Sequence, residues 1–358
     1  MRSCLFKSVL MILAVMLPLF ILEYSLSLKN GRHIEPAVNI FDDGPMYRLD
    51  PDLIYTFKPK AKGSLNLADI TDSKSINSFG LRNREISAES RSYRIIAAGD
   101  SFTEGIGVTR EESYPGQLEI YLKKETGLDL EVVNAGVSGY SPDQTYRYIM
   151  TKLLKLKPDI ILWNLTFPLD IYDASMWYPS LYDLREDQLI AKNGIANWLY
   201  LQNFLSLYTP SSLKKLQLYR LFYLNLPDID VLNRRPPGSR EKLINWSLEK
   251  IKIQVATLNK LASQKNFKLF LVLLPTKDLY QLPGQFNLQT PAEIEALKNQ
   301  IKKSITGVEI LDIEEMLNRS GNQRPEVWFY ANDIHPNAVG NAAIASAAAE
   351  LLRPYLSL

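Results

Sequence analysis

Cysteine and histidine are nearly absent from this sequence. Its 358 residues include one cysteine, Cys4, and two histidines. A single thiol cannot form an internal disulfide, so we expect the fold to be stabilised by its core alone. The sequence contains no CxxC or HExxH motif, and a zinc site built from cysteine or imidazole ligands is therefore not predicted. We expect no metal and no other cofactor.

An excess of charge of one sign is also lacking. The 41 basic and 39 acidic side chains leave a net charge of +2, and no long run of like charges occurs. Proteins that bind nucleic acids usually concentrate basic residues on one face or along one segment. The balance therefore argues against a nucleic-acid partner. With 46% hydrophobic and 22% charged residues, the chain has an ordinary globular composition.

The N-terminus carries a hydrophobic run preceded by positive charge. Arg2 and Lys7 come before an apolar stretch from Val9 to Leu22. This order is typical of an export signal, and with its flanking residues the stretch approaches the length of a membrane-spanning helix. A buried core helix is the weaker alternative, because the stretch is apolar on every face. No convincing cleavage site follows, so we expect residues 1–28 to form an uncleaved signal anchor with the remainder of the chain exported.

Turn-forming residues dominate the next segment, 29–91, which we interpret as a stalk with lead-in strands. From residue 92 onward, short β-rich runs alternate with helical patterns, which indicates a parallel α/β sheet. We expect strands at RIIAAG, LEVVNAG and DIILWNL, and helices near 114–125 and 143–156 between them. We assign 92–358 to one domain.

A long aromatic-rich segment interrupts this alternation from 171 to 238. We interpret it as a helical insertion that forms either a lid near the active edge or a satellite hydrophobic cluster. After it, we expect an amphipathic helix over 239–262, a buried strand over 268–275 and a helix that begins with a capping box at Thr290. The short strand GVEILD and an alanine-rich C-terminal helix complete the pattern.

The first strand of the alternating region ends in Gly99-Asp100-Ser101. The carboxyl ends of parallel strands form the ligand-binding edge of a sheet, so a hydroxyl at this point faces a cleft. The turn into the next helix leaves free N–H groups beside Ser101, which suit an oxyanion. Alternatively, Ser101 and Glu104 form a capping box, and the serine only caps a helix. Position alone favours the cap.

A serine nucleophile needs a base, and the chain offers only His33 and His335. His33 lies beside the expected anchor. His335 lies two residues after Asp333, at the entrance to the last helix, where an aspartate can orient the imidazole while its other nitrogen faces a serine. Taken singly, Asp333 would be a turn residue and His335 an exposed loop residue.

Three blocks of the sequence together resemble the GDSL or SGNH hydrolase family. They occur in the order of that family: GDSFTEG from Gly99, NAGVSGYSPDQ from Asn134 and DIHP from Asp333. The resemblance extends from about Tyr93 to the C-terminus. It implies a three-layer α/β/α sandwich around a parallel sheet of about five strands.

The resemblance also implies roles for individual residues. Ser101 would be the nucleophile and, through its N–H, the first oxyanion donor. Gly139 would be the second donor. His335 would be the general base, oriented by Asp333.

One block departs from the pattern of the family. A GxND-like motif is expected after the third strand, but the chain reads DIILWNLTFPLD and places Pro168 where the oxyanion asparagine should be. Proline has no N–H to donate. Asn164 and Thr166 precede it on the same face of the strand and could substitute if the local geometry shifts. The alternative for Asn164 is a strand polar group bonded to a neighbouring loop.

The expected function is serine-dependent ester hydrolysis, or transfer of an acyl group such as acetyl, on an envelope or extracellular carbohydrate or another ester. The expected partners are that ester substrate and the membrane, through the N-terminal segment. The domain is expected on the exported side, periplasmic or extracytoplasmic. Because the oxyanion asparagine is missing, the alternative is a catalytically weakened protein that binds glycan or an assembly partner.

Overall fold

The computed structural model describes residues 16–19, 21–22, 46–67, 70–86, 92–171, 181–185, 188–191, 240–282, 290–321 and 324–356. Most of the predicted signal anchor therefore lies outside the described residues, as does His33. Within these ranges, no helix combines the length and hydrophobicity that a membrane crossing needs.

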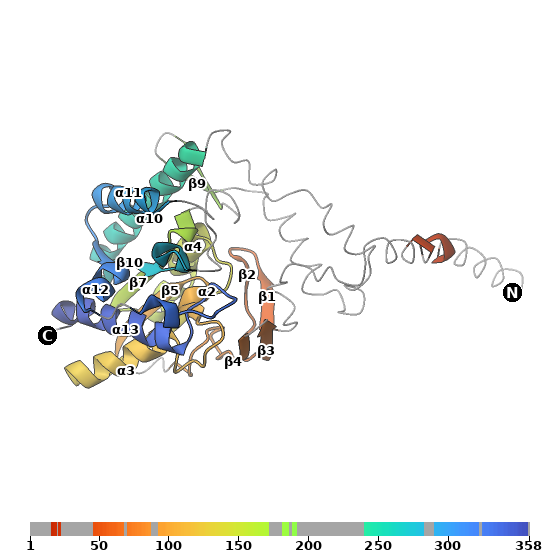
Figure 1. Cartoon of the computed structure of the whole chain (residues 1–358), viewed down its shortest axis with the longest axis horizontal. Coiled ribbons are helices and arrows are strands. Elements are labelled where there is room, and N and C mark those ends of the chain that lie inside the picture. Colours follow the sequence, from red (N-terminus) through yellow and green to blue (C-terminus); the bar gives the residue numbers. More distant parts are fainter. Residues whose placement is uncertain are drawn as a thin grey trace, which may run out of the picture.

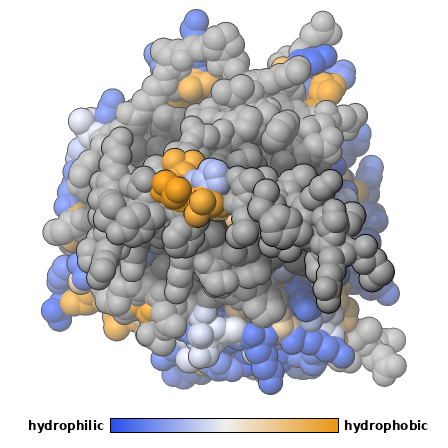
Figure 2. Space-filling view, turned by 90° about the vertical axis from the view of Figure 1, so that its right-hand side faces the viewer, coloured by the Kyte–Doolittle hydropathy of each residue, from blue (hydrophilic) through white to orange (hydrophobic). Residues whose placement is uncertain are grey.

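The described part of the N-terminal segment is helical at residues 16–19 and 21–22. Its hydrophobic side chains are exposed, with 57% of Met16, 60% of Leu17 and 56% of Ile21 accessible to solvent. Figure 2 views the molecule from the side on which this segment lies in Figure 1, and a small group of hydrophobic residues lies at the centre of that view. None of the side chains of residues 16–19 and 21–22 belongs to a buried hydrophobic cluster of the described residues.

A five-stranded sheet forms the centre of the domain, and all of its strands are parallel. Its strands in spatial order are β6 (Leu130–Gly136), β5 (Tyr93–Gly99), β7 (Ile160–Phe167), β10 (Lys268–Pro275) and β11 (Glu309–Asp312). The strand that follows β5 in the sequence, β6, pairs with one edge of β5, and the next strand, β7, pairs with its other edge. The order in which successive strands join the sheet therefore reverses at β5. In open α/β sheets, ligands bind at the carboxyl ends of the strands beside such a reversal, which is where β5 delivers Ser101.

Helices cover both faces of this sheet (Figure 1). Alternate residues of each strand point to opposite faces, so Ile96 and Ala98 belong to one hydrophobic cluster and Ile95 and Ala97 to the other. The first cluster is closed by α4 (Pro142–Thr151), α10 (Arg240–Lys265) and α11 (Pro291–Ser304). The second is closed by α3 (Tyr114–Thr126), α12 (Ile313–Arg319) and α13 (Ala338–Leu352). The expected three-layer sandwich around a parallel sheet is confirmed.

The element boundaries follow the sequence pattern closely. The helix predicted from Thr290 begins with a complete capping box, in which the Thr290 and Glu293 side chains each bond to the backbone of the other. The helix predicted over 143–156 is shorter, because α4 ends at Thr151 and the chain continues as a 3-10 turn, η2 (Leu153–Leu156). The short helix α12 was not predicted.

The described lead-in segment, residues 46–86, packs onto the domain as two antiparallel hairpins (Figure 1). Its strands are β1 (Tyr47–Asp50), β2 (Ile54–Phe57), β3 (Lys62–Leu67) and β4 (Ile70–Ser75). Met46, Leu53 and Phe57 are almost fully buried in the same hydrophobic cluster as α4. The expected lead-in strands are confirmed, but this segment is part of the folded core and does not stand apart from it as a stalk.

Most of the predicted helical insertion, 171–238, lies outside the described residues. Ile171 ends a short helical turn, and the rest of the described part forms a hairpin of β8 (Tyr182–Arg185) and β9 (Gln188–Ala191). The Asp143 carboxylate of α4 accepts hydrogen bonds from the backbone N–H groups of Leu181 and Tyr182. The backbone N–H and C=O groups of the hairpin residues are satisfied by pairing between the two strands, and not within a helix as predicted.

Candidate active site

The nucleophile candidate lies in the turn that leaves β5. The next helix, α2 (Ser101–Glu104), begins with Asp100 as its N-cap, and the Asp100 side chain accepts from Phe102 N–H at 3.0 Å. The capping-box alternative for Ser101 is therefore wrong, because the aspartate supplies the capping oxygen. The Ser101 hydroxyl is therefore not the group that caps α2.

That hydroxyl meets His335. The His335 Nε2 atom lies 2.8 Å from Ser101 Oγ, and the opposite ring nitrogen, Nδ1, lies 2.5 Å from Asp333 Oδ1. The same carboxylate oxygen accepts the His335 backbone N–H at 2.8 Å, which fixes the turn that presents the ring. The structure thus brings together the three residues proposed from sequence, across 234 positions of chain.

The imidazole ring of His335 is mostly buried but keeps some contact with solvent. The His335 side chain is 12% exposed, and the ring of Phe102 packs against it with 5.0 Å between ring centroids. The loop that carries it is tied down at both ends, since Lys277 Nζ donates to Ala331 O at 3.1 Å and Asn337 caps α13. A ring held in this way needs little reorganisation to accept a proton.

The charge of Asp333 is stabilised by its neighbours. Burial alone would raise the pKa of this carboxyl, but hydrogen bonds from His335 and the positive charges of His335 and Lys277 hold the pKa below its usual range. Asp333 is therefore ionised wherever His335 has to carry a proton. At Asp100 the effect of burial prevails and raises the pKa of the carboxyl, although hydrogen bonds from Thr166 and Phe102 oppose the rise.

The second predicted oxyanion donor, Gly139, lies in the loop after β6. Its φ of 75° is left-handed, a conformation that favours glycine. The loop is drawn against α2 at Gly136, where an added Cβ would lie 2.1 Å from Glu104 N. In the described part of the chain, neither the Gly139 N–H nor the Ser101 N–H donates to an acceptor. Both are available to an oxyanion.

The possible substitute donors are engaged elsewhere. Asn164 donates from Nδ2 to Thr103 Oγ1 at 3.0 Å and accepts from Tyr114 OH at 3.5 Å. These contacts fit the alternative of a buried strand polar group and speak against a donor role for Asn164. The Thr166 hydroxyl donates to Asp100 Oδ1 at 2.8 Å. Neither side chain takes the place left by Pro168, because each is committed to a partner within the fold.

Sequence reasoning missed the charged network beneath the nucleophile turn. Glu104 is fully buried, its Oε1 lies 2.5 Å from Lys74 Nζ, and its Oε2 accepts the Ser138 N–H at 2.7 Å and hydroxyl at 2.5 Å. Arg82, 1% exposed, pairs with Asp72 at 2.8 Å and donates to the last carbonyls of α2. The only signal was Glu104 itself, a carboxylate three residues after the predicted nucleophile.

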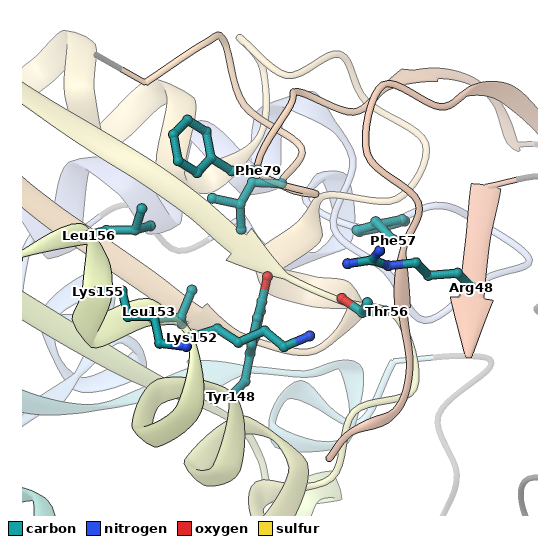
Figure 3. A pocket seen from close by; sticks show the side chains of 10 residues that line it. Arg48, Thr56, Phe57, Phe79, Tyr148, Lys152, Leu153, Lys155 and Leu156 are labelled. Carbon is teal, nitrogen blue, oxygen red and sulfur yellow. The ribbon is translucent and has the colours of Figure 1, made fainter. Parts of the chain in front are cut away.

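A cavity of about 270 Å³ lies between the lead-in segment and the end of α4 (Figure 3). Arg48, Lys152 and Lys155 line it together with apolar side chains such as Phe57 and Phe79. None of its lining residues is a candidate catalytic residue, so this cavity is separate from the Ser101 site. Among the described residues, no group of three or more acidic, histidine or cysteine side chains is arranged to hold a metal.

No family model matches the sequence, and no curated protein matches it. Similar solved structures include a protein described as lipolytic and of the G-D-S-L family from Desulfitobacterium hafniense DCB-2, with 16% identity, coverage of 73% of this chain and 99% of that chain, and a TM-score of 0.38. A GDSL-like lipase from Bacteroides thetaiotaomicron VPI-5482 has 11% identity, coverage of 76% and 93%, and a TM-score of 0.40. An acetylxylan esterase from Geobacillus stearothermophilus has 12% identity, coverage of 76% and 98%, and a TM-score of 0.41. At these values the similar structures do not assign the chain to a family, so its function has to be inferred from the geometry of Ser101, His335 and Asp333.

Proposed function

We propose that this chain is a serine-dependent esterase or O-acyltransferase of the SGNH type. The observation that carries the proposal is the continuous line of contacts from Ser101 Oγ through His335 to Asp333, at 2.8 and 2.5 Å. A serine hydroxyl becomes an effective nucleophile when a positioned base accepts its proton as it attacks. The residue types, their order and their distances match this requirement.

The proposed reaction has two half-steps. Ser101 Oγ attacks the ester carbonyl while His335 Nε2 takes its proton, and the Ser101 and Gly139 N–H groups stabilise the oxyanion. The intermediate collapses, and His335 returns the proton to the departing alcohol. His335 then removes a proton from water or from a sugar hydroxyl, whose oxygen attacks the acyl-serine. The bond from the acyl carbon to Ser101 Oγ breaks, and His335 returns the proton to Oγ, which regenerates the enzyme. Water gives hydrolysis and a sugar hydroxyl gives transfer.

For the substrate and the location we propose an acylated carbohydrate of the cell envelope, reached by a domain on the exported side of a membrane. The support is the sequence order of residues 1–28, positive charge followed by a long apolar run. The exposed hydrophobic side chains at residues 16–19 and 21–22 agree with a lipid-facing segment. Product analysis with and without a polysaccharide acceptor distinguishes transfer from hydrolysis.

The test of the mechanism is Ser101→Ala in the detergent-solubilised full chain, assayed with 4-nitrophenyl acetate. We expect turnover to fall to the level of the uncatalysed reaction while the melting temperature changes little, because the Ser101 side chain contributes no capping bond. Turnover equal to that of the unmodified chain would rule out a serine mechanism at this position.

The second candidate function is that of a non-catalytic glycan-binding or assembly partner. It is favoured by one observation, the commitment of Asn164 and Thr166 to other partners, which leaves the site with two backbone donors. Loss of one oxyanion donor typically costs about a hundred- to a thousandfold in rate. A folded full chain that binds polysaccharide but shows no Ser101-dependent turnover of any ester would favour this candidate.

A further inference from the structure

A hydrogen bond from the lead-in segment holds the peptide group that carries the Gly139 N–H. Tyr55, on β2, donates from its hydroxyl to Ser138 O at 2.7 Å. The Ser138–Gly139 peptide is trans, so its C=O and its N–H lie in one plane and point in opposite directions. A hydrogen bond that fixes the Ser138 carbonyl therefore also fixes the direction of the Gly139 N–H.

The other end of Ser138 is fixed as well. Its own N–H and hydroxyl bond to Glu104, which Lys74 of β4 holds in an ion pair. The preceding residue, Val137, donates its N–H to Gly99 O at 3.0 Å. A backbone hydrogen bond thus holds the loop against the end of β5, two residues before Ser101.

Tyr55 is well suited to this task. Its side chain is 6% exposed, and burial raises the pKa of its hydroxyl far above the usual range, so the group remains a donor at any working pH. Its ring packs edge-on against Tyr140, with 5.4 Å between centroids, and its own carbonyl accepts the Tyr140 hydroxyl at 2.7 Å. Rotation of the Tyr55 ring away from Ser138 would require repacking of this pair.

We propose that Tyr55 is a positioning residue of the oxyanion site, acting through the Ser138–Gly139 peptide. The proposal rests on the proposed function, in which the Gly139 N–H stabilises the tetrahedral intermediate. It makes the lead-in hairpin of residues 47–57 a part of the catalytic apparatus, although this hairpin contributes no reacting group.

The consequence is specific to the transition state. The negative charge that the Gly139 N–H stabilises develops on the carbonyl oxygen only as Ser101 attacks. A misdirected N–H should therefore lower kcat and leave KM nearly unchanged. If the tyrosine served only as core packing, its substitution would lower stability without lowering kcat at constant KM.

The chain provides a matched pair for the test, Tyr55→Phe and Tyr148→Phe. Each change removes one buried tyrosine hydroxyl, but the Tyr55 hydroxyl bonds to the Ser138 carbonyl, whereas the Tyr148 hydroxyl bonds to the Thr56 side chain. With 4-nitrophenyl acetate and the full chain, we expect Tyr55→Phe to lower kcat about tenfold, less than the loss of a whole donor, with KM changed less than about twofold. We expect Tyr148→Phe to change kcat less than about twofold, with a similar fall in melting temperature for both.

Titration of the reactive serine with a fluorophosphonate counts the competent molecules, so that partial unfolding of either variant does not enter kcat. Equal kcat values for the two variants, or a Tyr55→Phe effect confined to KM or to the number of competent molecules, would overturn the role of Tyr55. Turnover that survives Ser101→Ala would instead overturn the proposed function itself. The two failures are therefore distinguishable.

Discussion

Two regions of the molecule meet at the site and contribute to it in different ways. The C-terminal loop, residues 330–337, supplies the proposed base, His335, and Asp333, which orients it. The lead-in segment, residues 46–86, supplies Tyr55, Lys74 and Arg82, which contact the turn and the loop around the nucleophile. The comparison shows that the proposed base and the groups that hold the backbone around Ser101 come from segments far apart in the sequence. Changes in the first region should therefore abolish the chemistry, whereas changes in the second should weaken it and destabilise the fold.

The largest effect is expected from His335→Ala in the C-terminal loop. Without the base that accepts the Ser101 proton, kcat/KM should fall by about 10⁴-fold or more. The measurement is the initial rate of 4-nitrophenyl ester turnover by the full chain. His33→Ala is the matched control, because it removes the only other histidine of the sequence. A comparable loss in both variants, or in neither, would remove His335 from the mechanism.

A smaller effect on rate is expected from Glu104→Gln, which disturbs the grip of the lead-in segment. The change leaves the buried Lys74 without its counter-charge, and breaking a buried pair typically costs about 3–5 kcal/mol of unfolding free energy. Glutamine can still accept one bond from Ser138, so we expect kcat to fall only about tenfold. The measurements are kcat and denaturant unfolding.

The same variant should alter the dependence of stability on pH. Burial would raise the pKa of Glu104, but the charges of Lys74 and Arg82 and the bonds from Lys74 and Ser138 hold it below its usual value. Its stabilising effect is therefore complete above the unfolded pKa of about 4.3 and is lost as the pH falls through the lower folded value. As the pH falls from about 5 through the unfolded pKa and then through the lowered folded pKa of Glu104, the unmodified chain should lose more stability than Glu104→Gln.

Glu119→Gln is the control for both measurements. Glu119 also has a lowered pKa and also pairs with the lead-in segment, through Arg84, but it does not contact Ser138. It should weaken the acid dependence of stability and leave kcat unchanged. If Glu119→Gln lowers kcat as much as Glu104→Gln does, general destabilisation accounts for the effect and the grip on Ser138 does not.

The smallest effect on rate is expected from Asn164→Ala. The side chain of Asn164 bonds to Thr103 and Tyr114, and loss of those bonds should cost about 1–3 kcal/mol of stability. We expect kcat to change less than about threefold after correction for the folded fraction. A fall of a hundredfold or more would instead identify Asn164 as the third oxyanion donor.

The reacting residues could be predicted from the sequence because chemistry allows few residue types. With two histidines in the chain, the base had one serious candidate, and Asp333 stood at the spacing that orients it. The sheet was equally predictable, since buried strands such as Lys268–Pro275 are continuous apolar runs. Asp100 as the N-cap was not predicted, because a serine followed three residues later by glutamate fits the capping-box pattern regardless of which residue actually caps.

The supporting residues could not be predicted for a different reason. Tyr55 and Lys74 act across 83 and 30 positions of chain, on partners that only the tertiary packing selects. Nothing in a short hairpin sequence distinguishes a tyrosine that fills a core from one that orients a catalytic peptide. Turn residues around the lead-in strands suggested a stalk, and only the burial of Met46, Leu53 and Phe57 shows that the segment belongs to the core.

The central claim is that His335 activates Ser101 as a nucleophile, and labelling with a fluorophosphonate tests it most directly. We predict that the probe modifies the full chain on Ser101, identified by peptide mass spectrometry, and that the labelling rate falls at least about a hundredfold in His335→Ala while His33→Ala labels normally. Absence of labelling, modification of a different serine, or a labelling rate that His335→Ala does not change would contradict the account.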